Sequence, residues 1–191
     1  MTARSPVSRN AIGTMALAIC VLAFALVSGE SVARDLSKGE EAALADRIES
    51  FGAAVRARDF DEVLAVMPPV MIDAVAQSTG MSADELRAAI SQEMAELLKT
   101  RTLLNFSMSV ENAEHRSLPD GTPYVLLPTR TVLEAEGRKI ETSNHTLALM
   151  QNGDWYLVRL ENSAQVKSFT DAFPEFSGQS FPTGTWRVLQ Q

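Results

Sequence analysis

The residues from 123 to 162 constrain the fold more than any other part of this sequence. They read as three extended segments joined by tight turns: PYVLLPTRTVLEA, KIETSNHTLALMQ and WYLVRLE. The last join is Asn152-Gly153 between alternating apolar residues, a strong signal for a two-residue β-hairpin loop. Such strands form an antiparallel sheet, and that sheet must bury at least one face to be stable.

The segment before the sheet predicts amphipathic helices. Ser37 and Glu40 have the spacing of a capping box, and an apolar stripe at helical spacing follows through Leu44 and Val55. A short helix with Met67 on its apolar stripe is predicted from Asp59, and another from Pro69 to Ser78 with Gly80 as its stop. Ser82 and Glu85 form a second capping box, which opens a helix from Ala83 to about Lys99 with Met94 on its stripe. Helices followed by strands, without βαβ alternation, indicate an α+β fold with an antiparallel sheet. We expect one domain, residues 34–191.

Two further segments complete the predicted domain. A first strand from Thr102 to about His115 would make the sheet four-stranded, with Leu104, Phe106, Met108 and Val110 on its buried face. A short helix is predicted from Ser163 to Phe173. The tail FPEFSGQSFPTGTW is rich in aromatic residues, and we expect much of it to pack back on the domain.

The N-terminus has the pattern of a bacterial export signal. Arg4 and Arg9 precede the apolar run ALAICVLAFALV, within the ~7–15 residues of a signal core, and Ser31-Val32-Ala33 predicts cleavage after Ala33. We expect a periplasmic or secreted protein. The alternative is an inner-membrane anchor, because the apolar stretch reaches about 18 residues when counted from Ala11. Lipid attachment at Cys20 is disfavoured by the bulky residue before it.

Composition excludes several kinds of chemistry. Cys20 is the only cysteine and there are two histidines, so we expect no disulfide, no metal and no cofactor. The formal net charge is −7 and the sequence shows no Lys/Arg cluster, which argues against nucleic acid or an anionic membrane as partner. No serine-hydrolase or phosphate-binding motif is present. What remains is a soluble exported domain with little recognisable chemistry.

The order of elements resembles the nuclear transport factor 2-like superfamily, a cone-shaped α+β fold. The closing segment Asn152-Gly153-Asp154-Trp155-Tyr156-Leu157-Val158 is similar to the Gly-x-Trp-x-hydrophobic last strand common there. The resemblance covers about residues 36–162. It implies helices packed on a curved four-stranded antiparallel sheet around a cavity. Members include isomerases, cyclases, dehydratases and non-enzymatic binding modules, so the fold alone implies no activity.

The hairpin register gives candidate site residues. A two-residue loop at Asn152-Gly153 puts Leu149 opposite Tyr156, and a similar count through the preceding turn puts Arg130 and His145 on the same face. We expect the N-terminal helices to cover this face. Arg130, His145 and Tyr156 are then weak catalytic candidates: an anion-holding cation, a proton shuttle and a hydrogen-bond donor.

The alternative is that these residues are structural, because no third group completes a catalytic arrangement. Arg130 would then reach solvent, and His145 would be a half-buried hydrogen-bonded side chain. The opposite face of the sheet is also apolar, with Val125, Leu127, Leu133, Ile140, Ala148, Met150, Trp155 and Leu157. Two coverings are left open for it, a homodimer or the aromatic C-terminal tail.

These observations favour an exported, non-enzymatic binding or accessory domain of the cell envelope. Its partner would be a small apolar ligand or an envelope protein. The alternative is a cavity enzyme of the isomerase, cyclase or dehydratase type that uses acid–base chemistry.

Overall fold

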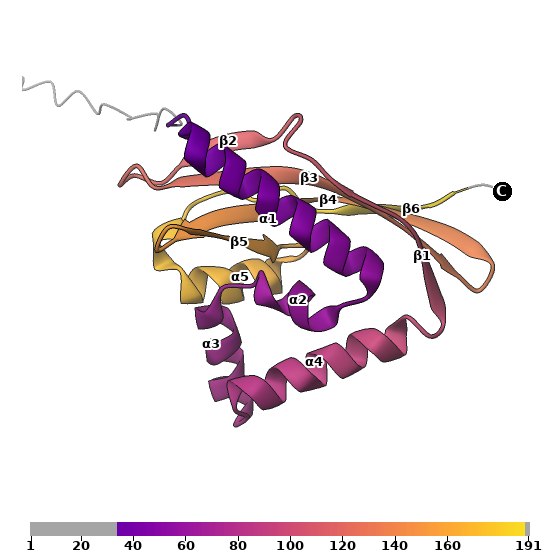
Figure 1. Ribbon diagram of the computed structural model, residues 1–191. Coiled ribbons are helices and arrows are strands. Elements are labelled where there is room, and N and C mark those ends of the chain that lie inside the picture. Colours follow the sequence, from indigo (N-terminus) through magenta and orange to yellow (C-terminus); the bar gives the residue numbers. More distant parts are fainter. Residues whose placement is uncertain (1–33, 190–191) are drawn as a thin grey trace, which may run out of the picture.

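The computed structural model describes residues 34–189. The predicted leader, its cleavage after Ala33 and Cys20 lie outside this range. Figure 1 shows helices packed against a curled antiparallel sheet that forms a half-barrel. The fold class is therefore α+β, as the sequence predicts.

The helices begin and end at the predicted signals. Ser37 and Glu40 form the expected capping box at the first helix, and Ser82 does the same with Glu85 at the fourth. Gly80 ends the third helix in the left-handed conformation, with φ of 72°. The helices are α1 (Lys38–Ala57), α2 (Phe60–Ala65), α3 (Pro69–Thr79), α4 (Ala83–Leu97), α5 (Ser163–Ala172) and the 3₁₀ turn η1 (Pro174–Phe176).

The sheet follows the order β1-β3-β4-β5, with β2 paired to β3 and β6 paired to β4. All pairs are antiparallel. Two long strands, β3 and β4, form its centre. The strands are β1 (Arg101–Met108), β2 (Glu114–Ser117), β3 (Pro123–Ala135), β4 (Arg138–Gln151), β5 (Asp154–Arg159) and β6 (Thr185–Leu189).

The predicted hairpin register is confirmed. Leu149 lies opposite Tyr156 across β4 and β5, and Pro128 lies opposite His145 across β3 and β4. Asn152 has φ of 55° and Gly153 has φ of 90°, the left-handed conformations that a tight hairpin loop of this type requires. Arg130, His145 and Tyr156 therefore share one face of the sheet, because side chains alternate between faces along each strand.

The predicted first strand is wrong in two respects. It is two strands, because the chain turns between Met108 and Glu114 before it pairs again with β3. The register also shifts between Leu103 and Asn105. This β-bulge turns Leu103 inward and leaves the Leu104 side chain 43% exposed. Simple alternation had placed Leu104 and Val110 inside, and both are exposed.

The aromatic tail packs back on the domain, as predicted. Phe173 and Phe176 are buried. The end of the tail adds a strand that the sequence did not predict, β6, whose Trp186 side chain is 72% exposed. Among residues 34–189, none of the helices is long and apolar enough to cross a membrane.

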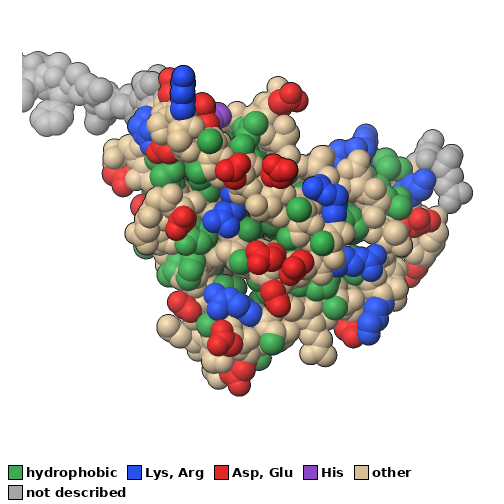
Figure 2. Space-filling model, in the orientation of Figure 1, with side chains coloured by type: hydrophobic (Ala, Val, Ile, Leu, Met, Phe, Trp, Pro, Cys, Tyr) green, Lys and Arg blue, Asp and Glu red, His purple; other side chains and the backbone are tan. Residues whose placement is uncertain are grey.

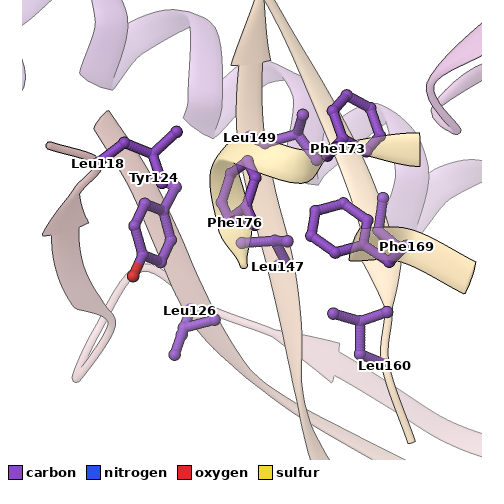
Figure 3. Close-up of a cluster of buried hydrophobic side chains, with 10 residues drawn as sticks. Leu118, Tyr124, Leu126, Leu147, Leu149, Leu160, Phe169, Phe173 and Phe176 are labelled. Carbon is purple, nitrogen blue, oxygen red and sulfur yellow. The ribbon is translucent and has the colours of Figure 1, made fainter. Parts of the chain in front are cut away.

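The C-terminal segment covers the face that carries His145 and Tyr156, and we call it the filled face. Rings from α5 and η1 point onto the leucines of β4 there (Figure 3). Phe169 is fully buried, 4.9 Å from Phe173 and 5.0 Å from Phe176 between ring centroids. The buried members are Leu118, Tyr124, Leu126, Leu147, Leu149, Val158, Leu160, Phe169, Phe173 and Phe176.

The N-terminal helices cover the opposite face, which we call the hollow face. At one end α1 packs Leu44 against Val125, Leu127 and Trp155. The Trp155 Nε1 donates to the Glu40 carbonyl at 3.0 Å and fixes α1 to β5. The expectation that these helices cover the His145 face is therefore wrong. So is the alternative that the tail covers this one, because the aromatic tail finds its apolar partners on the filled face.

Candidate ligand cavity

A cavity of about 740 Å³ lies between the helices and the hollow face. It begins beyond the point where α1 packs on the sheet. All four N-terminal helices, strands β1, β3, β4 and β5, and the start of α5 contribute to its wall. Its volume falls in the range of ~300–1,000 Å³ that is typical of sites for small molecules.

The cavity exists because the outer helices stand off the sheet. The backbone N–H of Leu157 donates to the carbonyl of Val66 at 2.8 Å, which fixes the end of α2 to β5. From there the chain turns outward. Helices α3 and α4 make their own small core of Ile72, Ala76 and Leu86. Since α4 packs mainly on α2 and α3, nothing fills the space beneath it.

The wall is predominantly apolar. Branched aliphatic side chains are its commonest members, and its aromatic rings and methionines are Phe51, Phe60, Phe106, Met67, Met71, Met94 and Met108. Methionine side chains are flexible and polarizable, so they adapt to ligands of irregular shape. A wall of this kind favours an apolar ligand that is held by shape and dispersion contacts more than by hydrogen bonds.

Few polar groups reach the cavity, and two of those on its floor bond to each other. The hydroxyl groups of Thr129 and Thr146 are buried and lie 2.8 Å apart, and Thr129 also donates to the Leu127 carbonyl at 3.1 Å. Arg159 is paired with Glu161, with Nη2 and Oε1 2.6 Å apart. The lining residues from the described part of the chain include no Asp, Glu or His.

The predicted site residues do not line this cavity. Arg130 and His145 come together instead at an open, polar hollow of about 480 Å³ on the filled face, beyond the aromatic cluster. Its wall also includes serine and threonine hydroxyls from β1, β4 and the tail. Tyr156 lies elsewhere, half-buried at the edge of the aromatic cluster. The three residues share a face but not a site.

Arg130 is tied into a charged network. Its guanidinium group binds the carboxylate of Glu141, whose side chain is only 4% exposed. Arg187 of β6 binds the other oxygen of the same carboxylate, with Nη2 and Oε1 2.6 Å apart. The hydrogen bonds from Arg130 outweigh burial and, with those from Arg187, hold the pKa of Glu141 below its ordinary value of 4.5. This network joins three strands.

Two features of the sequence belong to the cavity, but neither could be interpreted alone. Met67 and Met94 fell on the inner stripes of predicted helices, where apolar residues normally mark a packed core. Leu103 and Arg101 precede the bulge, so their orientation could not be read from alternation. Whether a helix stripe packs on a sheet or stands off it depends on tertiary contacts far away in the chain.

Comparisons add no constraint on the site. Among the described residues there is no group of three or more His, Cys, Asp and Glu side chains placed to hold a metal ion. No family model, curated protein or solved structure was found to match this chain. The resemblance to the nuclear transport factor 2-like superfamily therefore stays a prediction.

Proposed function

We propose that this protein is an exported binding domain that holds a small apolar ligand in the cavity over its hollow face. The observation that carries the proposal is the wall of that cavity, which is built from aromatic rings, methionines and branched aliphatic side chains. The leader-like N-terminal sequence supports a location in the cell envelope or outside the cell. The order of elements supports a fold of the nuclear transport factor 2-like type.

The free energy of burying an apolar chain is large enough to support measurable binding. Each buried methylene contributes about 0.8 kcal/mol, so a chain of about 12 carbons gives roughly 10 kcal/mol. Association costs at least about 4 kcal/mol in lost translational and rotational freedom. The difference of roughly 6 kcal/mol corresponds to a Kd of tens of micromolar, and longer chains bind more tightly.

The composition of the wall favours binding over catalysis. Acid–base chemistry needs a group that can gain or lose a proton within hydrogen-bond reach of the ligand. The described lining residues offer hydroxyl, amide and guanidinium groups and no carboxylate or imidazole. His145 and Tyr156 lie on the other side of the sheet, so an isomerase or dehydratase arrangement would lack its base. The cavity enzyme is the weaker proposal for this reason.

The protein partners named from the sequence stay predictions. A homodimer is one of the predicted covers for the broad apolar face of the sheet. That face is covered within the chain by α1, through Leu44 and its neighbours. The prediction of an envelope protein as partner depends only on the export signal.

Calorimetric titration with 1-dodecanol, below its solubility limit, tests the proposal. We expect saturable 1:1 binding with a negative heat-capacity change, the mark of apolar burial. Met94→Trp, which places a larger side chain at the cavity wall, should weaken binding at least tenfold. Met81→Trp is the matched control, because Met81 is exposed and outside the cavity. An absence of saturable binding to the wild-type protein would overturn the proposal.

A further inference from the structure

We infer that the ligand is a single-chain amphiphile with an anionic head group, and that Arg101 holds this head group at the mouth of the cavity. The inference rests on the proposed function, because it places the apolar chain in the same cavity. It adds the polar end of the ligand, its charge and the side chain that selects it.

The position of Arg101 follows from the strand register. Arg101 is the first residue of β1 and lies opposite Ala135 of β3. Leu103, two residues later, lies opposite Leu133, and both line the cavity. Residues two apart in a strand share a face, so Arg101 is on the cavity side. It forms the wall together with Leu97 and Leu98 at the end of α4, where the chain leaves the helix and enters the sheet.

Arg101 differs from Arg159, the other charged residue among the described lining residues, in having no side-chain partner. No ion pair or hydrogen bond to its side chain occurs among residues 34–189. Its neighbour Lys99 is paired with Glu96, with Nζ and Oε1 2.6 Å apart. The second arginine of the wall, Arg159, is neutralised by Glu161 at the β5–α5 connection. The cavity wall therefore carries one uncompensated positive charge, and it lies at one end.

This charge is unexpected in an acidic protein. The full chain has a formal net charge of −7, so an anion is repelled by most of the surface. Figure 2 shows Lys and Arg side chains, with Asp and Glu side chains among them, on the side of the molecule formed by β1 and β6. Arg101 and Arg138 belong to this side and lie opposite the same residue, Ala135, although they are far apart in the sequence.

A free guanidinium group beside an apolar cavity matches the two ends of an anionic amphiphile. Arginine donates paired hydrogen bonds to carboxylates and phosphates, and such bonds are stronger than those between neutral groups. The chain would lie among the methionines and phenylalanines, while the head group stays at the rim, where Arg101 is exposed to solvent. A cationic or neutral head group would leave Arg101 without a partner.

The test compares head groups on one chain length. Dodecanoate, dodecyl phosphate, 1-dodecanol and dodecyltrimethylammonium are titrated into the full exported protein below their micelle concentrations. We expect both anions to bind about two- to fivefold more tightly than the alcohol, the range of an ion pair at an exposed position. The trimethylammonium compound should bind more weakly than the alcohol. A difference between the carboxylate and the phosphate tells a fatty acid from a phospholipid-type head group.

Two variants test whether the preference for anionic head groups depends on Arg101. Arg101→Gln should reduce the ratio of anion affinity to 1-dodecanol affinity to about one. Arg138→Gln is the matched control, because Arg138 belongs to the same basic side but is outside the cavity wall and is paired with Glu136. It should keep the wild-type ratio.

The outcomes separate this inference from the proposed function. If no dodecyl compound binds, the cavity is not a ligand site and both proposals fail. If the alcohol binds as tightly as the anions, or if Arg101→Gln keeps the anion preference, the proposed function stands and the assignment of Arg101 is wrong.

Discussion

The two faces of the central sheet use the same strands in opposite ways. On the filled face, alternate residues of β3, β4 and β5 meet a cluster of phenylalanines from α5 and η1 and form one buried core with them. On the hollow face, the intervening residues meet α1 at one end and a cavity of about 740 Å³ at the other. A single run of strand residues thus supports a close-packed core on one side and a binding space on the other.

The two faces differ because different segments of the chain pack against them. The filled face receives a short segment with four rings, which follows β5 directly and is close enough to pack at once. The hollow face receives four helices, of which only α1 and the end of α2 touch the sheet closely. The close-packed side chains of the filled face therefore stabilise the fold. The hollow face has fewer packing contacts, because a cavity separates part of it from the helices.

Removing one aromatic ring from each face should give the largest difference in the free energy of unfolding. Phe169→Ala should lower the free energy of unfolding by about 3–5 kcal/mol, because Phe169 is fully buried among other rings. Phe60→Ala should cost no more than about 2 kcal/mol, because that ring borders the cavity and is not fully buried. Urea denaturation followed by circular dichroism measures both.

Equal losses for the two variants would contradict the distinction between the faces. If Phe169→Ala does not fold, Phe169→Leu replaces it. The leucine variant should still lose more stability than Phe60→Leu does.

A larger side chain should lower the free energy of unfolding when it is placed on the filled face and raise it when it is placed on the hollow face. Leu126→Phe on the filled face should cost about 1–3 kcal/mol, because a fully packed core has no room for the ring. Thr131→Leu on the cavity floor should raise stability by about 0.5–2 kcal/mol and weaken binding of 1-dodecanol. Thermal unfolding with and without the ligand measures both effects. Destabilisation by Thr131→Leu would indicate that the floor is already packed.

The charged network beyond the aromatic cluster should make the filled face sensitive to acid. The pKa of Glu141 is lowered by Arg130 and Arg187, so its contribution to stability is complete above about pH 4.5 and is lost as the pH falls through the lower folded value. Glu141→Gln should therefore reduce the midpoint of urea unfolding at pH 7, and the difference from wild type should shrink below pH 4.5. Glu136→Gln, at an exposed pair, is the control.

Substitution of the helix-capping residues should change stability least. Ser82 caps α4 over the cavity and Asn162 caps α5 over the filled face, each through a hydrogen bond to a backbone N–H at 3.2 Å and 3.0 Å. Each alanine substitution removes about 1 kcal/mol of helix stability. We expect Asn162→Ala to lower global stability and Ser82→Ala to increase hydrogen exchange mainly within α4. A global loss from Ser82→Ala would show that α4 is coupled to the core.

The sequence predicted most of the fold because its signals are local. The capping boxes at Ser37 and Ser82, the stop at Gly80 and the Asn152-Gly153 loop each fix a boundary within a few residues. The hairpin register followed from that loop. These features depend on hydrogen bonds and backbone conformations within a single turn, so no tertiary information is needed.

The site could not be predicted in the same way. Both faces of the sheet carry apolar residues in sequence, and the greater apolar character of the His145 face near the last hairpin led to the helices being assigned to it, whereas α5 and η1 cover that face. The bulge near Leu104 changes which β1 residues face the cavity, and no residue type marks it. Arg130, His145 and Tyr156 were placed on the correct face relative to one another, yet the C-terminal segment packs against Tyr156 and leaves Arg130 and His145 at a separate hollow.

Methionine methyl resonances test the central claim most directly, because the chain carries probes inside and outside the cavity. Met67, Met71, Met94 and Met108 line it, whereas Met81 and Met150 do not. On titration of methyl-labelled protein with 1-dodecanol, we predict that the four lining methyl groups shift together and saturate, while those of Met81 and Met150 stay in place. Shifts confined to Met81 and Met150, or no saturable shift at any methionine, would contradict the account of a ligand cavity on the hollow face.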